Sequence, residues 1–597
     1  PTWTTRPAPV PVGYRSSWFY FIPFSISGHV LLVIVQLFSY RSVIVQRSQY
    51  FYPTCHRIAD KFPFFSTLVL GFYRSFIVHT YKSYHSVPFM GDTMITLEDV
   101  TAALSQHEGT TLEFKESKEH LSKEFWKTYS SFANTHGGLV LFGIGEDDEK
   151  NAVVIGVSDP DVQRTELFST LSNPNKVSVD LIHSDDVQVF TIQGKSVLAV
   201  YVHEAQLNQK PVYLNGSLSS TFIRKHETDC RASREELSAM LRNQSDDLDS
   251  ELLNGYSIDD LDMTSIANYQ ARLSNRYPER NFPSMSPFDF LRNIGVFQID
   301  HNDHSTPKLT LGGLLFFGKY NSIRDRIHHY FVDFQDKRGT GERWTDRVHS
   351  GDLAFPNMNL FNYYAIVMDK LLASINRPFM LDDKMERRSY ADLGIALREA
   401  FVNMIVHADY LSDSTSLIVE IHNPYYLFIN PGIMKIPADS FFKGANSRPR
   451  NHILVQLFSQ MGAAERAGSG SQKIRDVVEK NDFKVPDIQT SLEKTTFKLW
   501  VATVIDVTPG LGDVEKDIYQ ILNENYDNGV SMSAHEIEEQ LPQYSHSRIM
   551  RALRTLYEKE LIIKLGGNRN RTYTKKISTL ELIRNFERTS TALKNMF

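Results

Sequence analysis

Residues 397–410, LREAFVNMIVHADY, set three polar residues at even intervals in an otherwise apolar segment. Glu399, Asn403 and His407 are spaced four residues apart, so a helix would place them along one stripe of its surface. The Leu, Phe, Val and Ile residues between them supply a face to be buried. The segment therefore predicts a helix that packs on one face and presents an acid, an amide and an imidazole on another.

Two glycine-containing turns follow this helix. LFINPGIMKIP, residues 427–437, has Asn430 and Gly432 at a turn after a predicted strand. Residues 450–480 predict a helix, a glycine turn with Gly468 and Gly470, and a second helix. Glycines at a helix N-terminus leave backbone N–H groups and the positive end of the helix dipole available to a phosphate.

Together, these segments resemble the GHKL-type ATP-binding domain in its diverged, RecG-related C-terminal form, over residues 385–505. The resemblance implies an α/β sandwich with ATP and Mg²⁺ as cofactors. It implies a catalytic role in ATP hydrolysis for Glu399 and a Mg²⁺ contact, through the nucleotide, for Asn403. The further cofactor-binding residues that it implies are His407, Asn430, Gly432, Gly468 and Gly470.

This chain departs from the GHKL pattern at two places. INPG offers no clear counterpart of the Asp that reads the adenine amino group, and the family's His-Arg-Asp-Tyr appears as HADY. The alternative interpretation is a structural helix whose polar side chains satisfy backbone groups in a neighbouring turn.

An earlier region, residues 94–245, predicts an α+β module. It contains, in order, EGTTLEFKES, FANTHGGLVLFGIGEDD, VIGV, PVYL and TFIRKH. The second motif is a helix that stops at a Gly-Gly pair, followed by LVLFGIG as one buried strand. The set resembles the Schlafen AlbA-type domain, which implies DNA binding.

The same module contains carboxylates that suggest an enzyme. Some Schlafen proteins are RNA nucleases that use three carboxylates, and here the resemblance implies Glu108, Glu113 and either Glu146 or Asp147. Clustered carboxylates can hold a divalent metal that activates a phosphodiester. The alternative is that Glu113 pairs with Lys115 and that GEDDEK is a solvated acidic turn.

The C-terminal region, residues 513–580, predicts a winged helix-turn-helix. Residues 513–540 contain one Lys against eight acids, whereas residues 548–597 contain twelve Lys and Arg against four acids. Three predicted helices precede a basic hairpin, and in this architecture the third helix enters the DNA major groove. The expected nucleic-acid contacts are Arg548, Arg551, Arg554, Arg569, Arg571, Lys575 and Lys576. A role in dimerisation or protein contact is the alternative.

Composition limits the remaining possibilities. A chain of 597 residues predicts several domains, and the expected segments are 1–93, 94–245, 246–384, 385–505, 513–580 and a helical tail, 581–597. A net charge of -6 excludes a uniformly basic nucleic-acid binder. Two cysteines exclude a disulfide framework and favour a cytoplasmic location.

The first 93 residues differ from the rest. Residues 1–89 hold 21 of the 70 aromatic residues, one acid and no Met. We interpret the segment as upstream translation outside the native protein. The alternative is a hydrophobic membrane anchor at residues 16–40, which carry no charge.

The connecting region, residues 246–384, offers a motif that resembles a P-loop. Gly313–Lys319 satisfies G-x-x-x-x-G-K, but four Leu and Phe residues fill the loop and Tyr320 replaces the Ser or Thr that would bind Mg²⁺. We interpret KLTLGGLLFFGKY as an apolar buried strand, and the sequence shows no helicase motor.

The sequence thus predicts an ATP-binding, DNA-binding transcriptional regulator, with RNA as a further partner and homo-oligomerisation left open. The alternative is a metal-dependent nuclease acting on RNA or DNA and gated by the ATP-binding domain.

Overall fold

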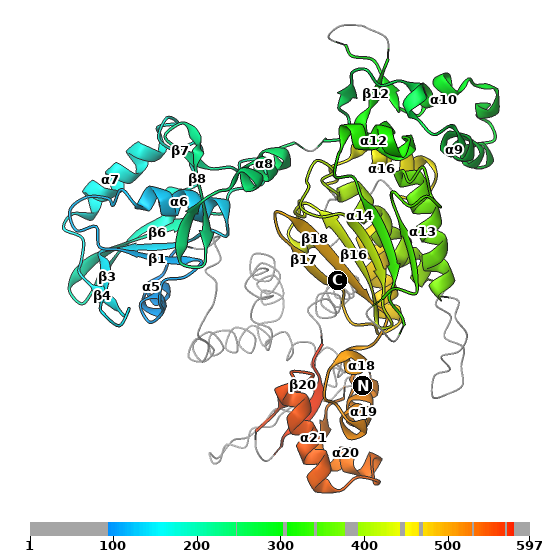
Figure 1. Ribbon diagram of the computed structural model, residues 1–597. Coiled ribbons are helices and arrows are strands. Elements are labelled where there is room, and N and C mark those ends of the chain that lie inside the picture. The colour runs from blue at the N-terminus through cyan, green and yellow to red at the C-terminus, as the bar shows by residue number, and fades with distance from the viewer. Residues whose placement is uncertain are drawn as a thin grey trace, which may run out of the picture. The chain divides into compact units, whose positions relative to one another are not determined.

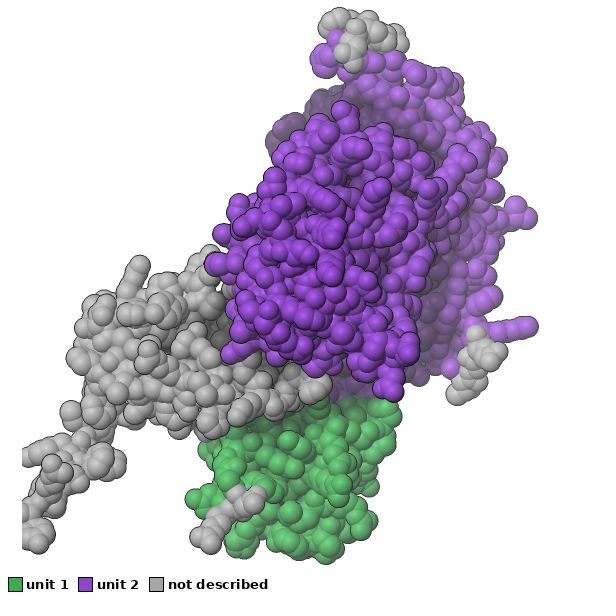
Figure 2. Space-filling view, turned by 90° about the vertical axis from the view of Figure 1, so that its left-hand side faces the viewer, with its two compact units in different colours: residues 1–69, 508–597 green, residues 70–507 purple. Residues whose placement is uncertain are grey.

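The computed structural model describes residues 94–577, apart from 246, 302–306, 340–342, 376–391, 442–447, 465–469, 528–529 and 568–569. Segments 1–93 and 581–597, Gly468 and Arg569 lie outside the described residues. The chain divides into two compact units, one of residues 70–507 and one that contains residues 508–597 (Figure 2). Within the described ranges, no helix combines the length and apolar character needed to cross a bilayer. The mixed α+β, multidomain class is confirmed.

The N-terminal module of the larger unit is built on a four-stranded sheet in the order β1-β2-β6-β5 (Figure 1). Strands β1 (Leu112–Lys115) and β2 (Gly138–Phe142) are parallel, and the other pairs are antiparallel. The module's other strands are β3 (Ile144–Glu146), β4 (Ala152–Val154), β5 (Val187–Ile192), β6 (Lys195–Val202), β7 (Tyr213–Leu214), β8 (Ser217–Lys225) and β9 (Thr228–Arg231). Its helices are α5 (Leu97–Ala103), α6 (Phe125–Asn134), α7 (Pro160–Leu171), η1 (Ser184–Asp186) and α8 (Arg234–Asn243).

The FANTHGG motif at the end of α6 has a structural role. The buried Asn134 side chain donates to the carbonyls of Val212 and Phe222, at 2.8 and 2.9 Å, and accepts from the Val212 N–H. Thr135 accepts a hydrogen bond from the Arg224 N–H at 2.9 Å. The motif therefore ties the end of α6 to β8 and to the segment before β7.

One strand prediction in this module is wrong in detail. LVLFGIG forms two strands, β2 and β3, because Gly143 between them adopts a φ of +84°, which interrupts an extended strand. Strand β3 then pairs with β4 as a hairpin.

The connecting region contains a three-stranded sheet in the order β10-β12-β11. Its elements are β10 (Leu252–Leu253), η2 (Ile258–Asp260), α9 (Met263–Arg276), η3 (Phe282–Ser284), α10 (Pro287–Asn293), β11 (Phe297–Gln298), β12 (Lys308–Thr310), α11 (Leu311–Phe317) and α12 (Tyr320–Arg326).

The strand predicted over the P-loop-like sequence is wrong for most of its length, because residues 311–317 form helix α11. Thr310 caps this helix by accepting the Gly313 N–H, and every residue of the helix is buried. A segment that is apolar on all sides has no periodicity to distinguish a helix from a strand. These residues form part of the hydrophobic core and leave no phosphate loop.

A six-stranded sheet in the order β14-β13-β15-β16-β18-β17 forms the rest of the larger unit (Figure 1). Its strands are β13 (Val332–Asp336), β14 (Asp346–His349), β15 (Leu417–Ile421), β16 (Tyr425–Pro431), β17 (Asp487–Thr490) and β18 (Lys494–Trp500). The helices are α13 (Leu360–Ile375), α14 (Leu393–His407), α15 (Ala438–Phe441), α16 (His452–Gln460), α17 (Gly470–Lys480) and α18 (Val504–Val507).

Helix α14 is central to this layer, because it packs on β16 and contacts α13, α16 and α17. Strands β13 and β14 precede residue 385, so the sheet extends across the domain boundary that we expected there. One hydrophobic core runs through the connecting region and this sheet.

The described part of the smaller unit contains three helices and a three-stranded sheet in the order β19-β21-β20. The helices are α19 (Asp513–Asp527), α20 (Ala534–Gln540) and α21 (His546–Glu558), and the strands are β19 (Met532–Ser533), β20 (Ile562–Leu565) and β21 (Thr572–Lys575). The three helices and the hairpin follow the expected order, and β19, between α19 and α20, is an additional strand that pairs with β21. The winged-helix assignment itself stays a prediction.

Candidate functional site

The polar stripe of α14 lines a cavity of about 160 Å³. Glu399, Asn403 and His407 all contribute to its wall, as the spacing of four predicts. The wall also includes residues of β16 and β18, among them Phe428, Asn430, Thr495 and Phe497. Elements far apart in the sequence therefore enclose the stripe.

Helix α17 begins directly beside Glu399 and Asn403. A Cβ atom added to Gly470, its first residue, would lie 2.7 Å from Glu399 Oε2 and 3.6 Å from Asn403 Nδ2. A side chain at this position would require Glu399 to shift, whereas glycine lets the backbone N–H groups that begin an eleven-residue helix approach the cavity. Lys473, one turn further on, has its Nζ 3.2 Å from Glu399 Oε1.

Burial keeps His407 neutral. Its pKa is lowered to about 4, first by burial and then by the charges of Arg450 and Lys435. An uncharged imidazole at the C-terminal end of the stripe can donate one hydrogen bond and accept another.

The turn after β16 has distinct roles for its two predicted residues. Asn430 is buried, lines the cavity and donates to the Pro431 carbonyl at 3.2 Å. Gly432 has a φ of +91°, and an added Cβ would lie 2.8 Å from Asp409 Cβ. Gly432 shapes the turn and is not among the residues that line the cavity.

Sequence reasoning missed several cavity residues. Lys435 and Arg448 place two cations at the wall, and Phe441 adds an aromatic ring 5.6 Å from that of Phe497. Lys435 follows the predicted Asn-Pro-Gly turn by three residues, so its proximity to that turn was the available signal. Nothing in the spacing pointed to Arg448 or Phe441.

The carboxylates of the N-terminal module are only partly brought together. Burial raises the pKa of Glu108, although its hydrogen bond from the Phe114 N–H opposes the shift, and the nearby charges of Glu113 and Glu146 raise it further. Asp147 instead accepts hydrogen bonds from Asn151 and Glu149 in a fully exposed turn, which lowers its pKa.

The Glu113 carboxylate forms ion pairs with two cations, Arg224 and Lys115. It is 6% exposed and accepts from Arg224 Nη2 at 2.5 Å and from Lys115. Arg224 also contacts Asp229 at 2.8 Å. The pairing of Glu113 with Lys115, the structural alternative, is therefore present.

In the smaller unit, Arg548, Arg551 and Arg554 are all exposed on α21. Arg554 Nε lies 2.7 Å from Glu558 Oε1, and Arg548 stacks over the Tyr544 ring.

The predicted wing residues of the hairpin differ among themselves. Arg571 is exposed, whereas Lys575 is only 8% exposed, like the other buried residues at the end of β21. Lys576 Nζ lies 2.6 Å from Glu560 Oε2. Lys575 is therefore poorly placed for phosphate contact.

Comparison with known families assigns three segments. Residues 108–233 match the family described as "Schlafen, AlbA_2", and residues 419–499 match the one described as "Putative ATP-dependent DNA helicase recG C-terminal". Residues 238–333 match a "Domain of unknown function (DUF8451)". No curated protein matches the chain.

Two solved structures are similar in part. The crystal structure of the DIP2311 protein from Corynebacterium diphtheriae shares 15% identity, covers 81% of this chain and 97% of its own, and has a TM-score of 0.32. The solution structure of the N-terminal domain of a "Putative ATP-dependent DNA Helicase RecG-related Protein" from Nitrosomonas europaea shares 25% identity over 21% of this chain and 84% of its own, with a TM-score of 0.15.

One α+β multidomain chain thus carries a segment that matches the Schlafen AlbA_2 family model and a segment that matches the RecG C-terminal-like family model, in line with the two sequence resemblances.

Proposed function

We propose that the chain is a cytoplasmic, ATP-binding and DNA-binding transcriptional regulator. The observation that carries the ATP-binding part is the cavity that the acid, amide and imidazole of α14 line together with Gly470, the first residue of α17. The two family matches support nucleic-acid binding and an ATP-related function.

The cavity wall suits the parts of a nucleotide. Phe428, Phe441 and Phe497 offer an apolar surface for a base. The N-terminus of α17, together with Lys435 and Arg448, offers N–H donors and positive charge for phosphates.

The donor set also fits Mg²⁺ held through the phosphates. Mg²⁺ prefers oxygen ligands and keeps several waters, and the Glu399 carboxylate and the Asn403 amide both lie close to the start of α17. The Asn403 side chain would supply its amide oxygen as a ligand. A bound Mg²⁺ would neutralise phosphate charge. Glu399, held near Lys473, would accept a proton from water as a general base.

A network of polar contacts connects the cavity to α8, the helix that follows the AlbA_2 segment. Arg450 is 1% exposed, donates to the His407 carbonyl at 3.0 Å and also binds the Asn243 side chain. Arg242 Nε lies 2.8 Å from Asp409 Oδ2, and the cavity residue Lys435 donates to the Ser245 carbonyl.

These contacts give nucleotide binding a route to the N-terminal module. A phosphate that attracts Lys435 or moves the 431–435 turn changes the groups that hold residues 242–245. Nucleotide binding would thus change the affinity of the AlbA_2 segment for DNA. The size of that change is the coupling free energy between the two sites.

The coupling can be tested with the full chain and a labelled duplex. We expect the Kd for DNA to change when ATP and Mg²⁺ are added, and we expect Arg242→Ala to reduce that change. Arg234→Ala, at the exposed far end of α8, is the matched control and should retain it. A Kd that ATP leaves unchanged in the unmodified chain would contradict the regulatory proposal.

One observation favours a nuclease as the second candidate. Glu108, Glu113 and Glu146 interact electrostatically, and this raises the pKa of Glu108 beyond the effect of its burial. Clustered carboxylates can hold a divalent metal, although the ligand atoms of these three do not all lie within 4.8 Å of one another. The pairing of Glu113 with Arg224 and Lys115 weakens this candidate, because it already compensates one of the charges.

Cleavage assays distinguish this candidate. A nuclease would cut tRNA, single strands or duplex with Mg²⁺ or Mn²⁺, and Glu113→Gln would abolish the cut. If the unmodified chain binds these substrates without cutting any of them, the nuclease interpretation is excluded.

A further inference from the structure

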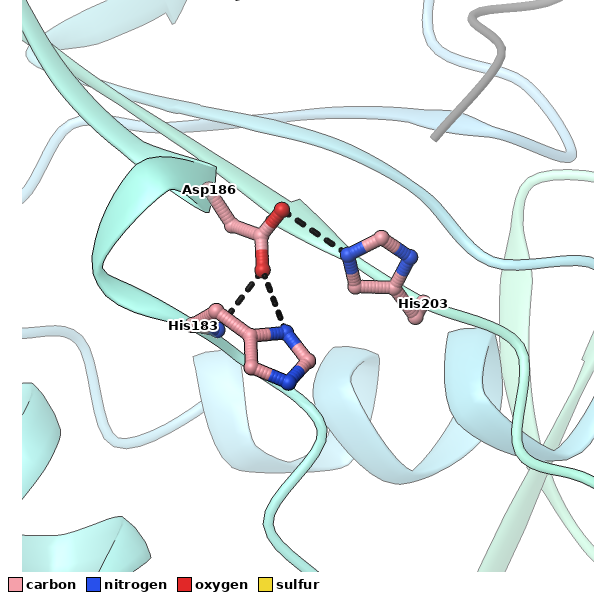
Figure 3. Close-up of side chains that lie close together, drawn as sticks. All are labelled: His183, Asp186 and His203. Carbon is pink, nitrogen blue, oxygen red and sulfur yellow. Dashed lines mark hydrogen bonds and ion pairs between the residues drawn. The ribbon is translucent and has the colours of Figure 1, made fainter. Parts of the chain in front are cut away.

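Three metal-ligating side chains meet in the N-terminal module, away from both sites described above. They are His183, Asp186 and His203 (Figure 3). Val187 at the start of β5 pairs with Val200 near the end of β6. The residues that precede β5 and those that follow β6 therefore lie at the same end of these two strands. The sheet register therefore brings residues 183–186 next to residue 203.

The geometry of this His-Asp-His cluster is convergent. His203 Nε2 lies 2.8 Å from Asp186 Oδ1, and His183 Nδ1 lies 3.2 Å from Asp186 Oδ2. One ligand atom from each residue lies within 4.8 Å of the other two. Among the described residues, no other group of three His, Cys, Asp or Glu side chains meets this criterion.

Two of the three ligands are held in place by their surroundings. The Asp186 side chain is 14% exposed and also accepts the His183 backbone N–H at 2.6 Å, which fixes the carboxylate. The His203 side chain is 27% exposed, and its ring packs edge-on against Tyr201 at 5.0 Å. The His183 side chain is 81% exposed, so its ring has room to adjust.

We propose that His183, Asp186 and His203 bind a divalent transition metal of the Zn²⁺ class. Zn²⁺ takes imidazole nitrogen and carboxylate oxygen at about 2.0–2.2 Å, which sets tetrahedral ligand atoms about 3.4 Å apart. The His–Asp contacts of 2.8 and 3.2 Å must therefore open slightly to admit the ion. Rotation of the exposed His183 ring supplies that movement. Two imidazoles disfavour Mg²⁺ and Ca²⁺, which prefer oxygen ligands.

Three protein ligands leave one tetrahedral position open toward solvent. The site would therefore bind water or an exchangeable ligand in that position. Because protons compete with the metal for the imidazole nitrogens, affinity should fall in acid.

Cobalt titration tests the proposal directly. The untagged full chain, in millimolar Mg²⁺ to fill the oxygen-ligand sites, is titrated with Co²⁺ while the visible absorbance is followed, and then with Zn²⁺ as competitor. We expect a visible band that saturates at one Co²⁺ per chain and is displaced by Zn²⁺. His183→Ala and His203→Ala should each weaken binding on the order of a hundredfold, since loss of even an outer partner of a metal ligand costs up to that much.

The matched control is His120→Ala. His120 is also an exposed histidine of this module that pairs with a carboxylate, at 2.6 Å from Glu166, but it lies outside the cluster. Its replacement should leave the titration unchanged. His183→Ala replaces an exposed side chain, so loss of binding there is not explained by unfolding. Equal titrations for the unmodified and His183→Ala chains, or no visible band in the unmodified chain, would overturn the proposal.

Discussion

Glu399 and His407 lie on one helix but in different electrostatic settings. Glu399 Oε1 lies 3.2 Å from the Lys473 ammonium group. His407 is buried near Arg450 and Lys435, and these cations oppose its protonation. At neutral pH the stripe thus combines one carboxylate with an uncharged amide and an uncharged imidazole.

The lowered pKa of His407 predicts that the stability of the fold depends on pH. The pKa is near 6.5 in the unfolded chain and about 4 in the folded one, so neutral His407 favours the folded state above pH 6.5. This contribution, about 3 kcal/mol, is lost as the pH falls from 6.5 toward 4. His407→Gln should remove that part of the pH dependence.

The measurement is the free energy of unfolding of the full chain in urea at several pH values between 4 and 7. Hydrogen exchange of the α14 amides is used as the readout. His452→Gln, an exposed histidine at the start of α16, is the control and should keep the unmodified profile. A His407→Gln chain with the same acid destabilisation as the unmodified chain would mean that His407 is charged or accessible in the fold.

At the scale of elements, amphipathic segments were predictable and uniformly apolar ones were not. The sequence predicted α21 correctly, because Ile549, Ala552, Leu553 and Leu556 repeat with helical spacing and are buried. Helix α11 was mistaken for a strand because it is apolar on every side. Gly143 divided a strand in two, since a φ of +84° cannot be read from an apolar run.

Helix α21 carries the prediction for DNA binding. Replacing Arg551 and Arg554 with Ala should weaken duplex binding and reduce the slope of log K against log salt by about one unit for each lost phosphate contact. Arg554 already pairs with Glu558, so the Arg551 replacement should have the larger effect. Fluorescence anisotropy at several salt concentrations measures both quantities.

The control is Lys516→Ala, an exposed cation on α19 outside the predicted recognition helix. It should leave the slope unchanged. If the Arg551→Ala, Arg554→Ala double variant keeps the unmodified slope, α21 contacts protein instead of DNA.

At the scale of the whole molecule, the candidate nucleotide site was only partly predictable. The stripe on α14 follows from local spacing, and the glycine start of α17 follows from local turn chemistry. The rest of the cavity depends on strands and loops brought together by the six-stranded sheet, which also recruits β13 and β14 from before the expected boundary at residue 385. Such non-local pairings leave no periodic signal in one sequence, so Arg448 and Phe441 could not be identified in advance.

Calorimetric titration of the full chain with ATP and Mg²⁺ tests the central claim, that the cavity beside α14 binds a nucleotide. The variants are Asn403→Ala and, as a matched control, Asn481→Ala, an asparagine beyond the last turn of α17 and outside the cavity lining. We predict that the unmodified and Asn481→Ala chains bind ATP in a Mg²⁺-dependent way and that Asn403→Ala abolishes this binding. Equal affinity in the unmodified and Asn403→Ala chains would contradict the account, because the polar stripe would then be structural.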